Sequence, residues 1–175
     1  MPARPSRLRQ PERLDDLLLY RLGRLTATAG TMVIRLCEGR HGITRREWRV
    51  IAALWEAEAL LSSELAERIQ LDRARTSRAI TSMVAKQLLQ RTAGAADRRQ
   101  ARLSLTEAGR SLYRKLMPEV QAINRDILAV LSADQVRTLD EALARMQLRA
   151  AQLAAEAELP KADRRRGGRS RALLG

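Results

Sequence analysis

Residues 73–86 carry the side chains with the clearest chemical role. A helical period places Ala79, Ile80 and Met83 on one side of this segment and polar side chains on the other. Guanidinium groups fork onto guanine or phosphate, and hydroxyl groups donate to either a base or a phosphate. A solvated helix face would have the same composition, so the neighbouring elements must decide. The residues predicted to contact a nucleic acid here are Arg73, Arg75, Thr76, Ser77, Arg78 and Lys86.

A second, shorter helix precedes this segment. It covers residues 64–69, packs through Leu65 and Ile69, and takes Ser62 or Ser63 as its N-cap. Only a few residues separate it from the basic helix. Two helices at this spacing, the second amphipathic with a basic outer face, form a helix-turn-helix unit that places the second helix in the DNA major groove.

A basic hairpin is predicted directly after the basic helix. Residues 89–92 and 101–105 are short and alternate with a period of two, and they flank a turn that contains Gly94. Arg98 and Arg99 lie in this turn, where they would reach a narrow minor groove whose negative potential attracts arginine. The hairpin therefore predicts a DNA-contacting wing.

Long helices are predicted on both sides of this middle third. The first covers residues 14–36 and is followed by a loop over 37–42, and a second helix starts at the capping box Thr44-Arg45-Arg46-Glu47. Thr106 starts a helix that runs to about residue 131 and that Pro118 is expected to bend. Ser132 caps a last helix with a heptad-like apolar seam suited to a partner, formed by Val136, Leu139, Leu143, Met146, Ala150 and Leu153.

Composition supports a polyanion as the partner. The net charge is +13, of which residues 1–13 contribute +3 and residues 160–175 contribute +5, so both ends are basic arms, or equally well solubilising tails. We expect a cytoplasmic protein, because no apolar segment spans a bilayer or forms a signal peptide. With a single cysteine, Cys37, a single histidine, His41, and no nucleophile or phosphate-loop motif, we predict no enzyme activity, no cofactor and no metal site.

The middle of the chain resembles the MarR family of bacterial transcription regulators. The resemblance rests on Leu71-Asp72, Thr76-Ser77-Arg78, Arg91, Asp97-Arg98-Arg99 and Leu103-Ser104-Leu105-Thr106-Glu107-Ala108-Gly109. It implies a mainly α protein with a small β-hairpin wing, in which a winged helix-turn-helix domain is joined to a helical dimerisation region from both chain ends. It also implies a homodimer on a palindromic operator of double-stranded DNA, with Asp97 orienting a wing arginine.

One position departs from the family pattern. Gln87 stands where the family usually ends its recognition helix with glycine. Gln87 must then adopt a left-handed conformation or let the helix continue, and the two alternatives give different angles into the wing.

The resemblance further implies a small effector in the crevice between the dimerisation helices and the winged domain. The residues expected there suit a small aromatic carboxylate, since guanidinium pairs with carboxylate and indole stacks on a ring. They are Thr31, His41, Arg45, Arg46, Trp48 and Arg49, with Arg35 nearby. Each has an alternative role: Trp48 as core, His41 as structural, and Arg45 or Arg46 as a phosphate contact. A redox role for Cys37 is disfavoured, because it follows a helix end that does not stabilise a thiolate.

The predicted organisation has five parts: a basic N-terminal arm (1–13), a dimerisation helix and loop (14–42), the winged helix-turn-helix domain (43–110), dimerisation helices (111–158) and a disordered basic tail (159–175). The function expected is that of a sequence-specific repressor released from its operator by the effector. The alternative is an architectural, weakly specific DNA-binding protein without an effector.

Overall fold

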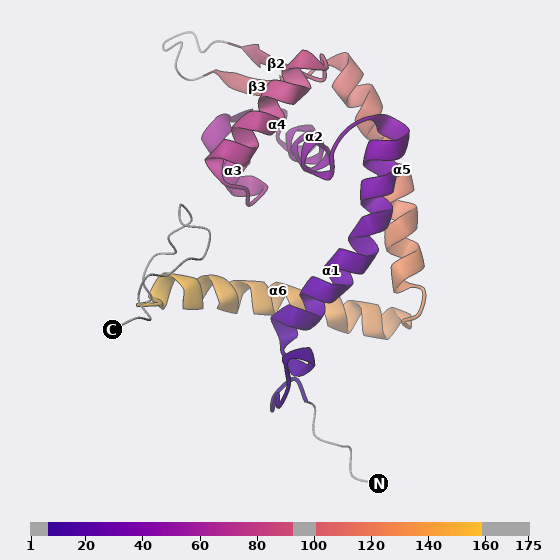
Figure 1. The fold of residues 1–175 in the computed structure, drawn as a ribbon, viewed down its shortest axis with the longest axis vertical. Helices are drawn as coiled ribbons and strands as arrows, with labels where there is room; N and C mark the ends of the chain where they lie inside the picture. The colour runs from indigo at the N-terminus through magenta and orange to yellow at the C-terminus, as the bar shows by residue number, and fades with distance from the viewer. Residues whose placement is uncertain (1–6, 93–100, 159–175) are drawn as a thin grey trace, which may run out of the picture. The chain divides into compact units, whose positions relative to one another are not determined.

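The computed structural model describes residues 7–92 and 101–158 and divides the chain into two compact units that meet between Ile127 and Leu128. Figure 1 shows the path of the chain. Asp97, Arg98 and Arg99 of the predicted wing lie outside the described residues. Unit 1 holds η1 (Leu14–Asp16), α1 (Leu18–Ile34), η2 (Arg35–Arg40), α2 (Arg45–Ala57), β1 (Ala59–Leu61), α3 (Ser62–Arg68), α4 (Arg73–Ala85), β2 (Leu89–Thr92), β3 (Arg102–Leu105) and nearly all of α5 (Glu107–Leu128).

The segment after α1 corrects one sequence-based expectation. Residues 37–42 were expected to form a loop, yet η2 continues α1 as a π-helical turn through Arg40. The amide of Ile43 then donates to the carbonyl of Cys37 at 3.0 Å, which reverses the chain toward α2. Wide turns of this kind extend α-helices in short pieces, so glycine content alone did not mark the end of the helix.

The capping box predicted at the start of α2 is confirmed. The Thr44 hydroxyl accepts from the amide of Glu47 at 3.2 Å, and the Glu47 carboxylate accepts from the amide of Thr44 at 2.6 Å. Two otherwise unpaired amides of the first turn are thereby satisfied.

The sheet has three antiparallel strands in the order β1-β3-β2. The predicted hairpin is present, with Leu89 opposite Leu105 and Thr92 opposite Arg102. The edge strand β1, which pairs Ala59 with Ser104, was not predicted, because three residues are too short for a periodic signal. This strand fixes the wing to the end of α2.

One core holds unit 1 together. It takes side chains from α2, α3, α4, both hairpin strands and α5, and its fully buried members include Ile51, Leu54, Leu65, Met83 and Leu116. The aromatic side chains join it as a stack, because the Tyr113 ring lies 4.3 Å from Trp55 and 5.6 Å from Trp48 between centroids. Several elements of the helix-turn-helix unit therefore share one rigid base.

Gln87 resolves the alternative left open by the sequence. Its φ is +58°, so the residue adopts the left-handed conformation and α4 stops. The amide of Leu88 donates to the Met83 carbonyl at 2.9 Å, and the amide of Gln87 donates to the Val84 carbonyl at 3.0 Å. This pair of bonds is the Schellman ending that glycine normally occupies. The chain thus enters β2 by the turn that the family pattern requires, with glutamine at the left-handed position.

The start of α5 is fastened to that same turn. The Thr106 hydroxyl donates to the Gln87 carbonyl at 2.7 Å and accepts from the Gly109 amide at 3.1 Å, while the Thr106 amide donates to the Leu88 carbonyl at 3.1 Å. Thr106 and Gly109 therefore form a latch between the end of α4 and the start of α5.

Unit 2 consists of the end of α5 and α6 (Ala133–Glu156). The Ser132 cap is confirmed, since its hydroxyl accepts from the Gln135 amide at 3.3 Å. Apolar side chains of the seam are left open to solvent, including Leu139, Leu143 and Leu153. No helix in the described part of the chain combines the length and the apolar character needed to cross a membrane.

Candidate nucleic-acid interface

The first turn of α4 is held by Asp72. The Asp72 carboxylate accepts from the amide of Arg75 at 2.8 Å as an N-cap, and its second oxygen lies 3.2 Å from Nε of Arg75. The cap explains why the helix begins here, directly after the turn that follows α3. Its consequence is a first turn whose arginines are exposed.

Around α4 the side chains form three faces. At 3.6 residues per turn, the buried face is made by Thr76, Ala79, Ile80 and Met83. Arg78 lies opposite the core and is exposed. Ser77 and Arg75 lie on opposite flanks, and each flank lines a different hollow.

The buried face corrects the prediction for Thr76. Its side chain has 0 % exposure, and its hydroxyl donates to the carbonyl of Asp72 at 3.0 Å. A buried threonine on the core face has no surface to offer to DNA. Its role in this structure is to anchor the first turn.

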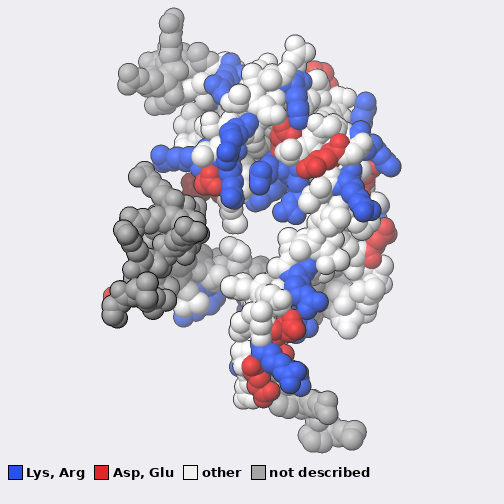
Figure 2. All heavy atoms as spheres, viewed as in Figure 1, with Lys and Arg blue, Asp and Glu red and all other residues white. Residues whose placement is uncertain are grey.

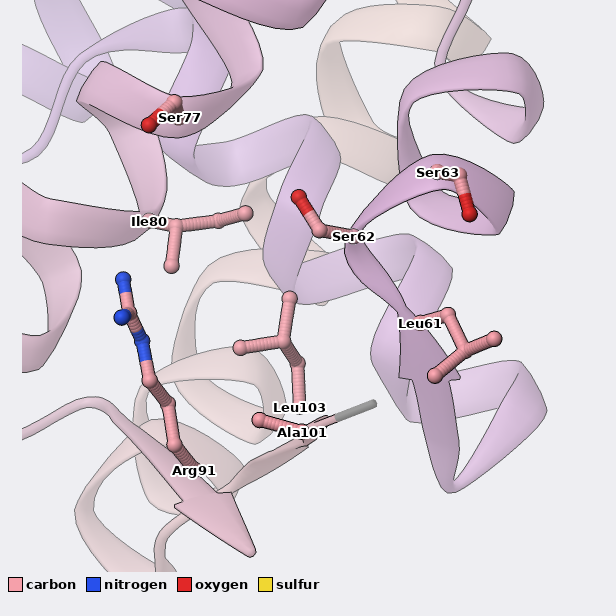
Figure 3. Close-up of a pocket in the computed structure, with 8 residues that line it drawn as sticks. All are labelled: Leu61, Ser62, Ser63, Ser77, Ile80, Arg91, Ala101 and Leu103. Atoms are coloured by element: carbon pink, nitrogen blue, oxygen red, sulfur yellow. The ribbon is translucent and has the colours of Figure 1, made fainter. Parts of the chain in front are cut away.

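The first hollow, of about 490 Å³, lies between α4, the start of α3 and the wing strands. Figure 3 shows the Arg91 guanidinium and the Ser62 hydroxyl reaching into it, with Ser77 at its rim and Ile80 and Leu103 beside it. One cation and two hydroxyls around an open hollow are the donors that a DNA phosphate takes. The prediction of Ser62 or Ser63 as the N-cap of α3 is wrong, because α3 begins at Ser62 and its N-cap is Leu61. Arg91 was noted only as part of the family pattern, and the fold brings it and Ser62 beside Ser77.

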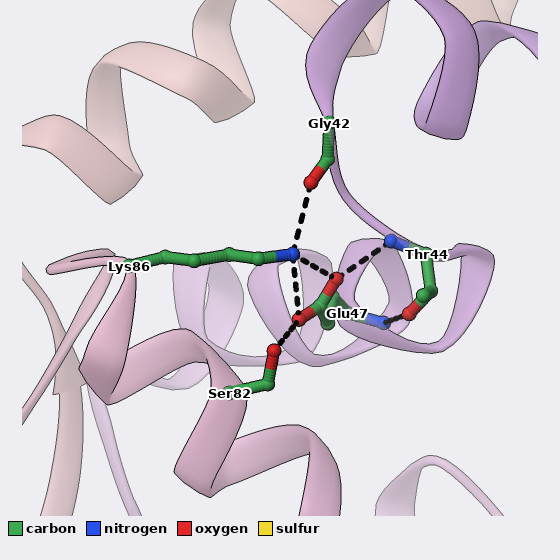
Figure 4. A network of polar contacts seen from close by, with 5 residues as sticks. All are labelled: Gly42, Thr44, Glu47, Ser82 and Lys86. Carbon is green, nitrogen blue, oxygen red and sulfur yellow. Dashed lines mark hydrogen bonds and ion pairs between the residues drawn. The ribbon is translucent and has the colours of Figure 1, made fainter.

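The end of α4 is occupied by a polar network with α2. Glu47 is 2 % exposed, and its carboxylate accepts from the Ser82 hydroxyl at 2.6 Å and from Nζ of Lys86 at 2.9 and 3.1 Å. Lys86 also donates to the carbonyl of Gly42 at 2.9 Å, as Figure 4 shows. The prediction of Lys86 as a DNA contact is therefore corrected: together with Ser82 it ties α4 to α2.

This network sets the charge state of Glu47. Burial raises the pKa of its carboxyl, but hydrogen bonds from Ser82, Thr44 and Lys86, together with the lysine charge, outweigh burial and hold the pKa below its usual value. The carboxylate is consequently ionised at neutral pH and pairs with Lys86.

The second hollow, of about 410 Å³, lies on the other flank of α4, against α1 and α2. Its apolar lining comes from Ala27, Ile34 and Leu71. Its polar lining comes from Glu38, Thr44, Arg45, Arg46, Arg49 and Arg75. Three of the arginines predicted for an effector site are thus brought together in one crevice, and an arginine of the basic helix joins them.

Two of these arginines have partners within the crevice walls. The Arg49 guanidinium donates to the carbonyl of Ile69 at the end of α3. The Arg45 guanidinium lies against Gly30, where a β-carbon would come within 2.6 Å of it. Gly30 therefore makes room in α1 for the side chain of Arg45.

The remaining residues predicted for the effector lie elsewhere. Trp48 is 8 % exposed and stacks on Tyr113 in the core. Thr31 is exposed on α1, and its hydroxyl donates to the carbonyl of Ala27 at 3.0 Å. His41 pairs with Glu119 of α5 at 3.0 Å, and Arg40 pairs with the same carboxylate. The pKa of Glu119 is lowered, first by the hydrogen bond from His41 and also by the charge of Arg40. His41 is thus a link between η2 and α5.

Cys37 is buried beside the same π-helical turn. Burial, and secondly the charge of Glu38, raises the pKa of its thiol to about 11. At neutral pH the sulfur is therefore protonated and a poor nucleophile.

Basic side chains gather over the winged part of unit 1. Figure 2 shows lysine and arginine over the region of α2, α3 and α4, with acidic side chains between them. A basic helix with exposed arginines in its first turn, a preceding short helix and a following hairpin define a winged helix-turn-helix DNA-binding domain.

Comparison with known proteins agrees with this class. The model of the MarR family matches residues 41–100. The homoprotocatechuate degradative operon repressor of Escherichia coli is 28 % identical over 104 residues, which cover 59 % of this chain and 70 % of the repressor. The transcriptional regulator TtmR of Methylorubrum extorquens is 27 % identical over 153 residues, or 87 % of this chain and 77 % of that protein.

Solved structures give the same result. A MarR-family transcriptional regulator from Silicibacter pomeroyi superposes with a TM-score of 0.67 at 27 % identity, covering 79 % of this chain and 98 % of the other. The winged helix-turn-helix part of the chain is therefore similar to the MarR family of transcriptional regulators, in sequence over residues 41–100 and in fold.

Proposed function

We propose that this protein is a homodimeric repressor that binds a palindromic operator and is released by a small aromatic carboxylate. The observation that carries the DNA-binding part is the first two turns of α4. Its inner face is locked into the core through Thr76, while Arg73, Arg75 and Arg78 remain exposed. Side chains held in this way at a helix N-terminus reach the base edges and the flanking phosphates of a major groove.

The wing side supports the same proposal. Ser62, Ser77 and Arg91 line one open hollow beside α4, which suits the phosphate that follows the contacted bases. We infer that Arg98 and Arg99 extend the contact into the minor groove and that Asp97 orients one wing arginine.

A homodimer is supported by the apolar side chains that each unit leaves exposed. They include Leu14, Leu19 and Leu25 near the start of unit 1, and Leu139, Leu143 and Leu153 on α6. A second copy that covers these side chains would remove the apolar area from water, which is the dominant gain in association. Two copies related by a two-fold axis match a palindromic site.

The effector part rests on the crevice between α1, α2 and α4. Four arginines and three apolar side chains around about 410 Å³ suit a small organic acid, because guanidinium pairs with carboxylate. The matching E. coli relative is named as a homoprotocatechuate operon repressor, which favours an aromatic acid. With Trp48 in the core, ring contacts come from Ala27, Ile34 and Leu71.

The experiment combines a thermal-shift screen of aromatic acids with DNA binding. A specific acid is expected to raise the melting temperature and to lower the affinity for duplexes selected by the protein from a random-sequence pool. Acids that stabilise the protein without weakening DNA binding, or no stabilising acid at all, would contradict the effector proposal.

A second candidate function is an architectural, weakly specific DNA-binding protein. It is favoured by one observation: residues 1–13 and 160–175 contribute +8 of the net charge of +13. Deleting residues 1–12 and 161–175 separates the two candidates. A repressor keeps its preference for the selected duplex, whereas an architectural protein loses most of its affinity for every duplex.

A further inference from the structure

Arg75 occupies two positions of interest at once. It belongs to the first turn of α4, the part of the helix that approaches DNA, and its side chain is 54 % exposed. It also lines the crevice against α1 and α2. Arg78, about one helical turn further along α4, is exposed but does not line the crevice.

The crevice arginines differ in how they are held. Arg49 donates to the carbonyl of Ile69, and Arg45 lies against the backbone of α1 at Gly30. Arg75 has an exposed ion pair with Asp72, whose side chain is 33 % exposed. An exposed pair of this kind is worth little and exchanges readily for another anion.

We propose that Arg75 couples the two sites by direct competition: its guanidinium binds either a DNA phosphate or the carboxylate of an acid in the crevice. This inference rests on the proposed effector site. A guanidinium forks onto one carboxylate or one phosphate at a time. An acid in the crevice therefore withdraws Arg75 from the DNA-facing flank of α4, and bound DNA withdraws it from the crevice.

Competition of this kind needs no rotation of the winged domain. The residue moves between partners around its own side-chain torsions, while the backbone of α4 stays fixed by the core contacts of Thr76 and Met83. Release of DNA should then fail when Arg75 alone is changed, even though both binding sites remain folded.

The experiment measures the coupling factor in the full-length protein. This factor is the ratio of the DNA Kd at a saturating concentration of the acid to the DNA Kd without it, and linkage requires the same factor for the acid. The probes are homoprotocatechuate and benzoate, and the DNA is a duplex selected by the wild-type protein. The variants are Arg75→Gln, Arg75→Lys and the matched control Arg78→Gln.

Arg75→Gln is expected to weaken DNA binding about tenfold, to reduce the salt slope by about 0.9, and to weaken acid binding about tenfold. Its coupling factor is expected to fall to about 1 from a wild-type value in the range of roughly 5 to 150. Arg75→Lys keeps a charge but loses the planar fork, so it should retain more DNA affinity and still lose most of the coupling.

Arg78→Gln should weaken DNA binding to a similar extent, yet leave acid binding and the coupling factor at wild-type values. A further variant, Asp72→Ser, keeps a capping oxygen for the Arg75 amide and removes the competing carboxylate. It should bind both the acid and DNA more tightly. Melting temperatures near that of the wild type establish that each variant is folded.

Two failures are distinguishable. If homoprotocatechuate and benzoate both fail to bind the wild-type protein, the effector proposal fails and this inference fails with it. If either acid binds and releases DNA from Arg75→Gln as effectively as from the wild type, the proposed effector site stands and the competition at Arg75 is refuted.

Discussion

Replacing Gly109 with alanine probes the latch between the end of α4 and the start of α5. A β-carbon at Gly109 would lie 2.3 Å from the carbonyl oxygen of Leu88 and 3.2 Å from Cδ2 of Leu105. The first contact is far inside van der Waals distance and involves backbone. That oxygen also accepts the amide hydrogen of Thr106 at 3.1 Å, so it cannot move without losing a hydrogen bond.

The expected magnitude follows from three contributions. Overpacking costs about 1–3 kcal/mol, and the lost hydrogen bond costs about 1 kcal/mol. Alanine recovers at most about 1 kcal/mol of helix propensity relative to glycine. We therefore expect Gly109→Ala to lower the free energy of unfolding by about 2 kcal/mol, although the same change in an open helix is stabilising.

The measurement is urea unfolding followed by tryptophan fluorescence, since Trp48 and Trp55 both contact Tyr113 of α5. The matched control is Gly23→Ala in α1, where a β-carbon would meet nothing within 4 Å and stability should rise by about 1 kcal/mol. Both are compared at one protein concentration, because association into the proposed homodimer would add to the apparent stability. A Gly109→Ala protein as stable as the wild type would refute the latch.

Three further predictions follow from the same contacts. Gln87→Gly should raise the free energy of unfolding by about 0.5–1 kcal/mol, because φ is +58° at this position and glycine adopts this angle without strain. A lower free energy of unfolding in urea titrations would contradict the Schellman ending. Glu47→Gln should cost about 2 kcal/mol at neutral pH. The pKa of Glu47 is lowered from the ordinary carboxyl value of 4.5, so its ionisation stabilises the fold above pH 4.5 and this stabilisation is lost as pH falls through the lowered pKa. The difference in free energy of unfolding between the wild type and Glu47→Gln should therefore shrink below pH 4.5. A difference that does not depend on pH in acid titrations would count against an ionised Glu47. Arg91→Gln should weaken binding of all duplexes by about tenfold and reduce the salt slope by about 0.9 in fluorescence anisotropy, and an unchanged slope would exclude a phosphate in the wing hollow.

The sequence was sufficient where local chemistry decides the structure. The structure contains the capping boxes at Thr44 and Ser132 and the two hairpin strands with their period of two. Each of these features depends on residues only a few positions apart. The edge strand β1 and the π-helical turn η2 could not be predicted in this way. The strand depends on tertiary pairing with β3. The π-helical turn is local, but it follows no apolar period that distinguishes it from a loop.

At the candidate site, the local pattern reaches its limit for a related reason. A helical period identifies the polar side of α4, but it does not say which polar side chains face another element. Lys86 was predicted to contact DNA, and only the approach of α2 shows that it pairs with Glu47 instead. Conversely, Arg75 was predicted as a DNA contact alone, and the fold places it in the crevice as well.

The most direct test of the central claim is an anisotropy titration of the full-length protein on two duplexes of equal length. One is selected by the protein from a random-sequence pool, and the other is its scrambled sequence. The wild type should bind the selected duplex at least about a thousandfold more tightly, and the double variant Arg73→Gln, Arg78→Gln should lose most of that ratio. Equal affinity of the wild type for both duplexes, or a ratio unchanged in the double variant, would contradict base reading by the first two turns of α4.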